Sequence, residues 1–504
     1  MDEARLWALI EDQGEREPLI ACGEARAAVD LLQHLAQQYG EQGQVAAELA
    51  GRLARRLPAD EQAHDGAECT RWTHLRPTAP KQPRPDWPLT IDIWRPEYGS
   101  TRQTAGTEPP AAAALAAGPG RAASGRVQAR RWDAPQVTDF QELRARAAAD
   151  LDFDEPWMGH AWAAVPRHQF VPDTVWVVQD GVYQPFRRSD DPDRWARLVY
   201  DSTTAIATQV DDGDPAAGGG DVPTSSISAP VAVFAMLAEL DLQPEHRVLE
   251  IGAGTGYNAA LLAERVGARR VTTLEIDPEV ADGARAALHR AGYGGVTVLE
   301  ADGEQGWPRG APYDRLVATA SVTSIPWAWV EQVQPGGLIV SPFRTVFCSH
   351  GLARLTVSGG HAEGRFAGAV NFMAVRGQRA RPHISEVFSA ESWKESRESK
   401  ADLDVAMLAD PHAEFAVGLR LADVAHWPQD GGHWWCSRDS WAYSADGAVY
   451  QWGPRNLADE TADALAWWAD AGRPELFDFG LTVTADGHRV WLGDPSEAWP
   501  LAAA

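Results

Sequence analysis

The sequence predicts an α/β fold in which a parallel β-sheet carries helices on both faces. From about residue 160 to 350, short apolar runs alternate with helical patterns, and this βαβα alternation is typical of a parallel sheet. One of the runs ends in a glycine-rich turn that leads into the next helical pattern. The expected strands are 247–251, 270–276, 296–299, 315–318 and 337–342.

Size and composition fit a folded chain of several domains. The chain has 504 residues, of which 44% are hydrophobic and 23% are charged, and at roughly 150 residues per domain it has room for about three domains. Its formal charge of −26 would repel a phosphate backbone or an anionic lipid surface. We therefore expect neither nucleic acid nor a membrane as a partner.

The cysteines indicate a reducing compartment. Cys22, Cys69, Cys348 and Cys436 stand far apart and form no CxxC pair, which suits neither a disulfide framework nor a zinc knuckle. No secretory signal is expected, because the first residues are acidic and no apolar core follows them. We expect a cytoplasmic protein without a metal, since no group of His, Cys and Asp has convincing metal-ligand spacing.

Four regions follow one another along the chain. Residues 1–57 are expected to be helical, because apolar residues recur there at helical spacing. Residues 58–136 are a linker rich in Pro, Ala and Gly, whose composition buries too little side chain to offset the cost of ordering. Residues 137–360 are expected to form the α/β domain, and residues 361–504 a separate α+β domain.

The C-terminal region contains ten of the 22 tryptophans. It also contains two expected hairpins, 441–452 around Asp446-Gly447 and 481–492 around Asp486-Gly487, because Asp-Gly between alternating runs favours a tight hairpin turn. Tryptophan offers a large and stiff contact area. These residues therefore either recognise another molecule or fill the core of their own domain.

The segment 247–257 carries the clearest chemical signal. An apolar strand is followed by Gly252, Gly254 and Gly256 and then by a helical pattern, and glycine lets the backbone turn sharply and approach a ligand. Glu275 ends the next strand, where an acid accepts hydrogen bonds from ribose hydroxyls. The Gly-x-Gly-x-Gly spacing favours a nucleoside ligand without a pyrophosphate, and the alternative is a tight turn that binds nothing.

A third strand ends at Asp302-Gly303. Sheets of this kind bind ligands at the carboxyl ends of their strands, so Asp302 is expected to accept the exocyclic amine of adenine. The alternative is that Asp302 only caps the helical turn that follows.

Seven short segments between residues 160 and 343 carry a family resemblance. They are 165–172 (VPRHQFVP), 200–201 (YD), 226–230 (SISAP), 248–257 (VLEIGAGTGY), 302–303 (DG), 311–314 (APYD) and 334–337 (QPGG). This part of the chain resembles the protein-L-isoaspartate O-methyltransferase family, and it covers under half of the sequence. The resemblance implies a Rossmann-like, S-adenosylmethionine-dependent methyltransferase domain.

The resemblance also implies how the cofactor S-adenosylmethionine is held. The glycine-rich turn would lie under its methionine part, Glu275 would bind the ribose, and Asp302 would lie near the adenine. The cofactor-binding residues expected on this basis are Gly252, Gly254, Gly256, Tyr257, Glu275, Asp302 and Gly303.

The implied substrate is an Asp or isoAsp carboxylate in a peptide. An ionised carboxylate is already nucleophilic, so the enzyme mainly has to align it with the methyl donor. Ser228 matches the active-site serine of the family and would orient the carboxylate, and its alternative role is a helix cap. Ser226 and His168 are also expected to contact the substrate, although a lone histidine is more often a structural hydrogen-bonding residue.

The chain extends beyond the resemblance at both ends and carries an extra Gly- and Asp-rich loop, 211–222, which we expect to be mobile. We expect its tryptophan-rich end, residues 361–504, to recognise the substrate peptide. This end resembles extended members of the family that accompany ribosomally made peptides, such as lanthipeptides and graspetides. In those systems a methylated Asp collapses to an aspartimide, which can hydrolyse to isoaspartate. We therefore expect methylation of a precursor peptide. General repair of isoaspartyl proteins and a non-catalytic peptide-binding module are the alternatives.

Overall fold

The computed structural model describes residues 139–502, apart from 152, 180, 217–218, 380–381, 401–402 and 430. All of these residues belong to one compact unit, Gln82–Ala504. The expected helical region 1–57 and the expected linker 58–136 lie outside the described residues. Within the described part of the chain, no helix has the length and apolar character needed to cross a membrane.

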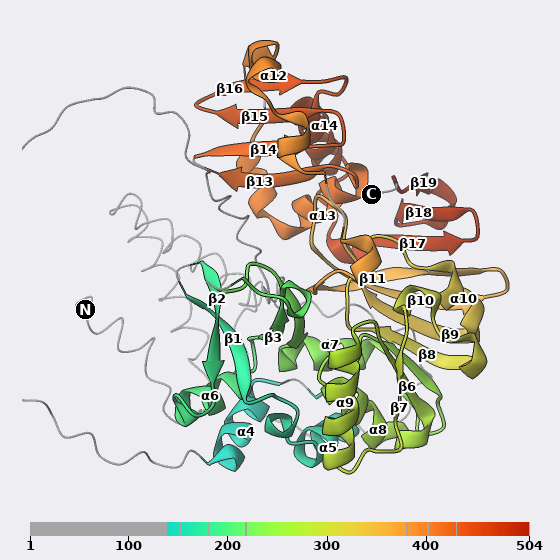
Figure 1. Ribbon diagram of the computed structural model, residues 1–504. Helices are drawn as coiled ribbons and strands as arrows, with labels where there is room; N and C mark the ends of the chain where they lie inside the picture. Colours follow the sequence, from blue (N-terminus) through green and yellow to red (C-terminus); the bar gives the residue numbers. More distant parts are fainter. Residues whose placement is uncertain are drawn as a thin grey trace, which may run out of the picture. The chain divides into compact units, whose positions relative to one another are not determined.

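A ten-stranded sheet forms the centre of the fold (Figure 1). Five of its strands coincide with the expected ones: β5 Val248–Ile251, β6 Val271–Glu275, β7 Thr297–Glu300, β8 Tyr313–Ala318 and β9 Val333–Pro342. They pair in parallel in the order β9-β8-β5-β6-β7. This confirms the predicted α/β fold with a parallel sheet.

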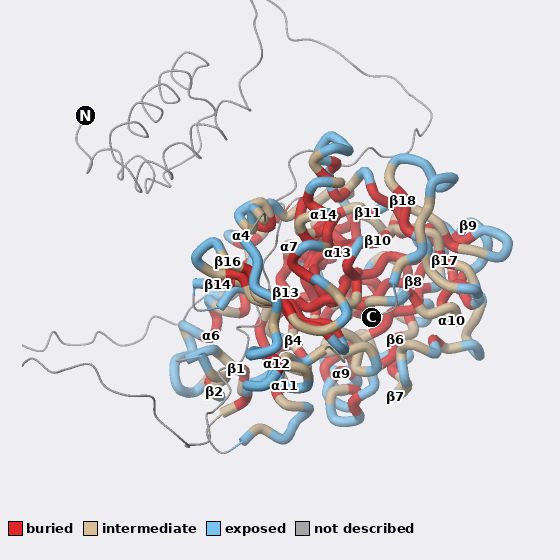
Figure 2. The backbone as a smooth tube through the Cα atoms, turned by 90° about the horizontal axis from the view of Figure 1, so that it is seen from above, coloured by how far each residue is buried: buried red, intermediate tan, exposed pale blue. Residues whose placement is uncertain are grey.

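Helices cover both faces of this sheet. Successive side chains of a strand point to opposite faces, so a strand that is buried on both sides contributes to two apolar cores. Val248 of β5 belongs to one apolar core, and its neighbour Leu249 belongs to the other. Figure 2 colours the buried residues red, and they are concentrated in the sheet and in the helices that cover it. The first core includes α5 Pro156–Ala164, α7 Pro230–Glu239, α8 Tyr257–Val266 and α9 Pro278–Arg290, and the second includes α10 Trp327–Gln332, α13 Pro411–Arg420 and α14 Leu457–Asp470.

The sheet continues past residue 360, where the sequence suggested a domain boundary. The additional strands, all antiparallel to their neighbours, are β10 His350–Ser358, β11 His361–Asn371, β17 Phe479–Thr484, β18 Gly487–Leu492 and β19 Trp499–Pro500. Strand β11 pairs with β10 on one side and with β17 on the other. The hairpin around Asp486-Gly487 is therefore part of the central sheet and not of a separate C-terminal domain.

A second sheet contains the other expected hairpin. Its strands are β12 Arg397–Lys400, β13 Ala425–Gln429, β14 Gly432–Cys436, β15 Trp441–Ala445 and β16 Ala448–Trp452, which pair in the order β12-β16-β15-β14-β13. Trp435 and Ala442 of this sheet share a core with α13, α14 and the central sheet. The C-terminal region thus has the expected mixture of helices and strands, but it packs onto the α/β region through a common core.

A third sheet, of four strands, precedes β5 and the glycine-rich turn along the chain. It has the order β2-β1-β3-β4 and follows α4 Phe140–Ala149 and α5, with α6 Pro192–Val199 inserted between β2 and β3. Its strands are β1 Thr174–Gln179, β2 Val182–Arg187, β3 Ile206–Val210 and β4 Pro223–Ile227. Because β4 leads directly into α7, the serines at the end of β4 lie near the carboxyl ends of β5 and β6.

Candidate active site

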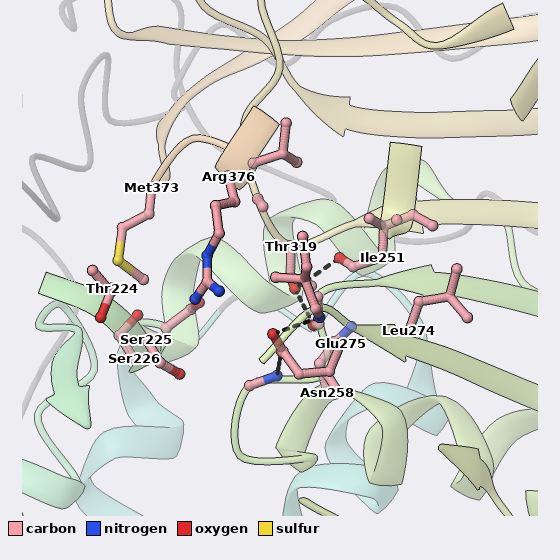
Figure 3. A pocket seen from close by; sticks show the side chains of 18 of the residues that line it. Thr224, Ser225, Ser226, Ile251, Asn258, Leu274, Glu275, Thr319, Met373 and Arg376 are labelled. Atoms are coloured by element: carbon pink, nitrogen blue, oxygen red, sulfur yellow. Dashed lines mark hydrogen bonds between the residues drawn. The ribbon is translucent and has the colours of Figure 1, made fainter. Parts of the chain in front are cut away.

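A cavity lies at the carboxyl ends of β5 and β6, next to the end of β4 (Figure 3). Its lining comes from segments that are far apart in the sequence: 224–228, 251–255, 257–258, 274–276, 302–304, 319–320 and 373–376, together with Val233 and Arg379. All of the predicted site residues except Gly256 and His168 line this cavity. The tertiary structure therefore brings the expected cofactor residues and the expected substrate serines to one place.

The glycine-rich turn adopts backbone conformations that other residues rarely take. The φ angles of Gly252, Gly254 and Gly256 are +91°, +50° and +83°. A Cβ on Gly252 would lie 2.9 Å from Oγ1 of Thr319, and one on Gly254 would lie 3.2 Å from a backbone carbonyl oxygen. Gly256 instead is the N-cap of α8 and lies against Leu288 of α9. Its role in this geometry is helix packing, whereas Gly252 and Gly254 border the cavity.

Glu275 holds the turn from the end of β6. Its Oε2 accepts a hydrogen bond from the amide of Gly254 at 2.9 Å, and its Oε1 accepts from the amides of Ile276 and Asp277 at 3.0 and 3.2 Å. Burial raises the pKa of Glu275, and these backbone hydrogen bonds oppose that effect in part. The carboxyl group thus has a defined position in the cavity, beside the exposed apolar side chain of Ile276.

Asp302 both caps a helical turn and borders the cavity. Its side chain accepts a hydrogen bond from the amide of Glu304 at 3.0 Å, as the N-cap of the short 3-10 turn Gly303–Gln305. A Cβ on Gly303 would lie 2.5 Å from Cγ2 of Ile251, so this position has room only for glycine. The two roles considered for Asp302 are compatible in this geometry.

The end of strand β4 and the residue that follows it bring serines to the cavity. Ser225 and Ile227 are buried, whereas Ser226 and Ser228 are half-buried, and all four residues line the cavity. The N-cap of α7 is Ala229, and no side chain caps that helix end. Ser228 is therefore not the cap of α7, which was the structural alternative for this residue.

Arg167 supports the serine segment from behind. Its side chain is fully buried, its Nε donates to the carbonyl oxygen of Val199 at 2.8 Å, and its Nη2 donates to that of Ile227 at 3.4 Å. It thereby fixes the residue that immediately precedes Ser228. Arg167 lies in the VPRHQFVP segment, but the sequence does not reveal which of those side chains reaches the serine strand.

His168 lies outside the cavity lining, contrary to the expectation that it contacts the substrate. Its Nδ1 is 2.7 Å from the hydroxyl of Tyr200, and its ring stacks on Phe140 with 4.2 Å between ring centroids. Burial, and to a smaller extent Arg188, lowers the pKa of His168. The geometry is that of a structural hydrogen-bonding histidine.

Two arginines of the cavity were not singled out from the sequence. Arg376 follows β11 and points between the serines and Glu275 (Figure 3). Its Nη2 pairs with Asp212 at 2.9 Å and with Asp277 at 3.1 Å, while its buried Nε has no hydrogen-bond partner among the described atoms. Arg379 also pairs with Asp212, at 2.9 Å. The only sequence signal was a basic run after an apolar strand, which carries no recognisable motif.

Asp212 belongs to the extra loop 211–222, which is anchored at its base. The carboxylate of Asp211 accepts hydrogen bonds from the amides of Asp221 and Val222 at 3.0 and 2.8 Å. The loop also lines a second cavity, which shares Gly254 and Thr255 with the first. The loop and the segment after β11 therefore meet through ion pairs at the border of the candidate active site.

Glu250 gives a pH-dependent prediction. It lies on β5, is fully buried, and accepts a hydrogen bond from Nδ2 of Asn258 at 2.7 Å. Burial raises its pKa from 4.5 to about 7. Because the folded-state pKa is raised, this group stabilises the fold below about pH 4.5, and that contribution is lost as the pH rises through 7.

We predict that the free energy of unfolding of Glu250→Gln rises relative to that of the parent chain as the pH is raised from 4.5 to above 7. The expected change in this difference is about 3 kcal/mol, since each unit of pKa shift corresponds to about 1.4 kcal/mol. Denaturant unfolding of both proteins across this range measures the difference. Parallel pH profiles for the two proteins would contradict the raised pKa.

Gly254→Val tests the cofactor half of the cavity. The branched side chain would occupy the space at the turn and would be strained at a φ of +50°, so binding of S-adenosylhomocysteine should be lost in calorimetry. Gly267→Val is the matched control, because Gly267 also has a positive φ, at the end of α8, but has no atom within 4 Å of its Cβ position and does not line the cavity. Equal affinities of the Gly254→Val and parent proteins would rule out this location.

Comparisons with known proteins agree with this geometry. The family model described as protein-L-isoaspartate(D-aspartate) O-methyltransferase matches residues 205–380. A protein-L-isoaspartate O-methyltransferase of Methanoculleus marisnigri is 42% identical over 153 residues, which cover 30% of this chain and 68% of the relative. One of Methanopyrus kandleri is 39% identical over 187 residues, which cover 37% of this chain and 68% of the relative.

Further matches cover the relatives to different extents. A protein-L-isoaspartate O-methyltransferase of Hyperthermus butylicus is 43% identical over 134 residues, which cover 25% of this chain and 56% of the relative. The chain thus spans between about half and two thirds of the length of these curated relatives. A solved structure named protein-L-isoaspartate O-methyltransferase covers 71% of this chain and 100% of its own, with 19% identity and a TM-score of 0.42.

The matched residues include the serine segment of β4, the glycine-rich turn, Glu275, Asp302 and Arg376. Together with about 40% identity over two thirds of two relatives, this identifies the family. The chain belongs to the protein-L-isoaspartate O-methyltransferase family, whose enzymes depend on S-adenosylmethionine.

Proposed function

We propose that this chain transfers a methyl group to the carboxylate of an Asp or isoAsp residue in a peptide. The observation that carries the proposal is the cavity itself, in which the glycine-rich turn and Glu275 border the same space as Ser226, Ser228 and Arg376. The names of the relatives support the same reaction. A non-catalytic binding module is disfavoured, because the residues expected to bind the cofactor and to orient a carboxylate line the same cavity.

The chemistry of one half of the cavity suits S-adenosylmethionine. Gly252 and Gly254 leave backbone open to the ligand, Glu275 offers acceptors for ribose hydroxyls, and Ile276 offers an apolar surface for the base. Asp302 would accept the adenine amine at the next strand end. The bound cofactor supplies a methyl group that is activated by its attachment to a sulfonium.

The other half suits a carboxylate. The hydroxyl of Ser228 would donate a hydrogen bond to one carboxylate oxygen, and the positive charge of Arg376 would keep the substrate carboxyl ionised and therefore nucleophilic. The buried Nε–H of Arg376 is a donor without an acceptor among the described atoms, and leaving such a donor unsatisfied costs about 1–3 kcal/mol. A carboxylate in the cavity would reach this buried donor only if the guanidinium of Arg376 turned toward it.

We further propose that the natural substrate is one dedicated peptide, such as a ribosomal natural-product precursor. The family model ends at residue 380, and the chain beyond it carries an aromatic surface formed by Phe388, Trp393, Trp434, Tyr443 and Tyr450. Phe388 and Trp393 are 36% and 38% exposed. A repair enzyme that accepts many damaged sequences has no evident need for such a surface.

The rings of the aromatic surface contact one another in a continuous group. Trp434 lies opposite Tyr443 on β14 and β15 with 4.6 Å between ring centroids, and Trp393 lies 4.9 Å from Tyr450. Half of the C-terminal tryptophans are instead buried in the fold, namely Trp427, Trp435, Trp441, Trp468 and Trp491. Core packing therefore explains those five, and the recognition proposal rests on the rings that stay accessible.

Methylation would lead on to an aspartimide. The backbone nitrogen that follows the esterified residue attacks the ester carbonyl, a C–N bond forms, and methanol leaves with the amide proton. Water then opens the five-membered ring to Asp or isoAsp. This sequence makes the methyl ester a short-lived product that mass spectrometry must capture early.

Ser228→Ala tests the proposed reaction. Loss of one orienting hydrogen bond at a reacting group should raise the barrier by about 2–4 kcal/mol, and the affinity for S-adenosylhomocysteine should stay unchanged in calorimetry. Methyl transfer to a short isoaspartyl peptide is the measurement. Ser358→Ala, at an exposed serine of β10, is the control, and turnover of Ser228→Ala within a factor of about three of the parent would mean that Ser228 does not orient the carboxylate.

Trp393→Ala separates a dedicated substrate from general repair. The substrate for this test is a precursor peptide encoded beside the gene. We expect kcat/KM of Trp393→Ala for this peptide to fall at least about tenfold, because hot-spot aromatic residues contribute more than 1–2 kcal/mol to binding. Activity on a short isoaspartyl peptide should not change. Val178→Ala, which truncates an exposed side chain of β1, is the control. Equal losses on both substrates, or no loss on either, would favour general repair.

A further inference from the structure

We propose that Cys348, His350 and Glu414 form a metal site that binds zinc. Each side chain offers one ligand atom, and these atoms all lie within 4.8 Å of one another. The first two residues flank the start of β10, and Glu414 lies in the first turn of α13. None of the three lines the candidate active-site cavity, so this site is independent of the proposed methyl transfer.

The distances fit the spacing of ligands around a tetrahedral ion. The Sγ of Cys348 is 3.5 Å from Nδ1 of His350, and this Nδ1 is 3.7 Å from Oε2 of Glu414. With zinc bonds of about 2.3 Å to sulfur and about 2.0–2.2 Å to nitrogen and oxygen, tetrahedral ligand atoms stand roughly 3.3–3.6 Å apart. The ligand atoms of Cys348 and Glu414 lie within 4.8 Å of each other, so a rotation of the partly exposed Glu414 side chain would bring the third ligand to the ion.

The orientation of the imidazole points to Nδ1 as its ligand atom. The Sγ of Cys348 lies at similar distances from both ring nitrogens of His350, 3.5 Å from Nδ1 and 3.7 Å from Nε2. However, Nε2 is 3.1 Å from the carbonyl oxygen of Pro411, which can only accept, so Nε2 carries the proton and the neutral ring has its lone pair on Nδ1. A backbone carbonyl in this role is typical of metal-binding histidines.

The kind and burial of the ligands favour zinc. Thiolate, imidazole and carboxylate together suit zinc better than magnesium or calcium, which prefer oxygen ligands alone. Cys348 and His350 are buried, whereas the side chain of Glu414 is 32% exposed. The exposed side gives an ion a path into the site and leaves a fourth coordination position for water.

A bound ion would connect two parts of the fold that are distant in the sequence. Strand β10 belongs to the central sheet, and α13 shares a core with both the central and the five-stranded sheet. A zinc ion would therefore cross-link the C-terminal region to the methyltransferase sheet. The spacing Cys348-x-His350 alone does not indicate a metal, because the third ligand comes from a separate helix.

Metal analysis of the full chain tests the site. After purification without an affinity tag that binds metal, mass spectrometry of the elements should find about one zinc per chain in the parent protein. Cys348→Ala and Glu414→Gln should each lose it. Cys436→Ala is the matched control, because Cys436 is the other free cysteine of the described residues and is also buried, but lies outside the cluster, and this variant should keep the zinc.

Cobalt gives a second measurement that does not depend on activity. The parent chain and Cys436→Ala, stripped with a chelator and loaded with Co²⁺, should show the sulfur-to-cobalt absorption band, and Cys348→Ala should lack it. If Cys348→Ala does not fold, Glu414→Gln is the deciding variant, because the Glu414 side chain is partly exposed. This variant should bind cobalt more weakly than the parent chain, and chelation should no longer lower its Tm. A parent chain that contains no zinc and takes up no cobalt would overturn the proposal, as would unchanged metal content in Cys348→Ala and Glu414→Gln.

Discussion

The two-sided pairing of β11 is the constraint on which the rest of the structure depends. One edge of this strand pairs with β10 and thus with the methyltransferase sheet, and the other edge pairs with β17 and thus with the end of the chain. Where β11 ends, the backbone turns over the cavity and contributes Met373, Arg376 and Arg379 to its lining. The strand that completes the candidate active site is therefore also the strand that seats the C-terminal region, and a chain cut at residue 360 would lose both.

The candidate active site holds charged side chains of both signs. The protein carries a formal charge of −26, and the cavity is lined by two arginines, Arg376 and Arg379, as well as by three acidic residues. Asp212 and Asp277 hold these arginines in place. Although burial raises the pKa of Asp277, hydrogen bonds from Val280 and Arg376 keep it below its usual value, so this carboxylate stays ionised. The result is a pair of fixed cations within an otherwise acidic cavity lining.

The tryptophans serve two purposes that composition cannot separate. Trp435 and Trp468 fill the core between the two sheets, whereas Trp393 stacks on the buried Trp441 with 5.7 Å between ring centroids and remains partly exposed. Trp441 also donates a hydrogen bond to Ser392, 3.1 Å away, and so ties the segment that carries Trp393 to the sheet. The accessible rings are thus supported by buried ones, which gives the aromatic surface a rigid base.

The sequence by itself determined the parallel strands, the glycine-rich turn, Glu275, Asp302 and the serines, because these depend on patterns that are local in the chain. Only the tertiary structure decided that the C-terminal hairpin joins the central sheet, since strand pairing between β11 and β17 depends on contacts over more than a hundred residues. The same reason explains Arg376, whose position after an antiparallel strand carries no local signature. It explains His168 as well, because its partners Tyr200 and Phe140 lie on different elements, and only the folded chain shows that they hold it away from the cavity.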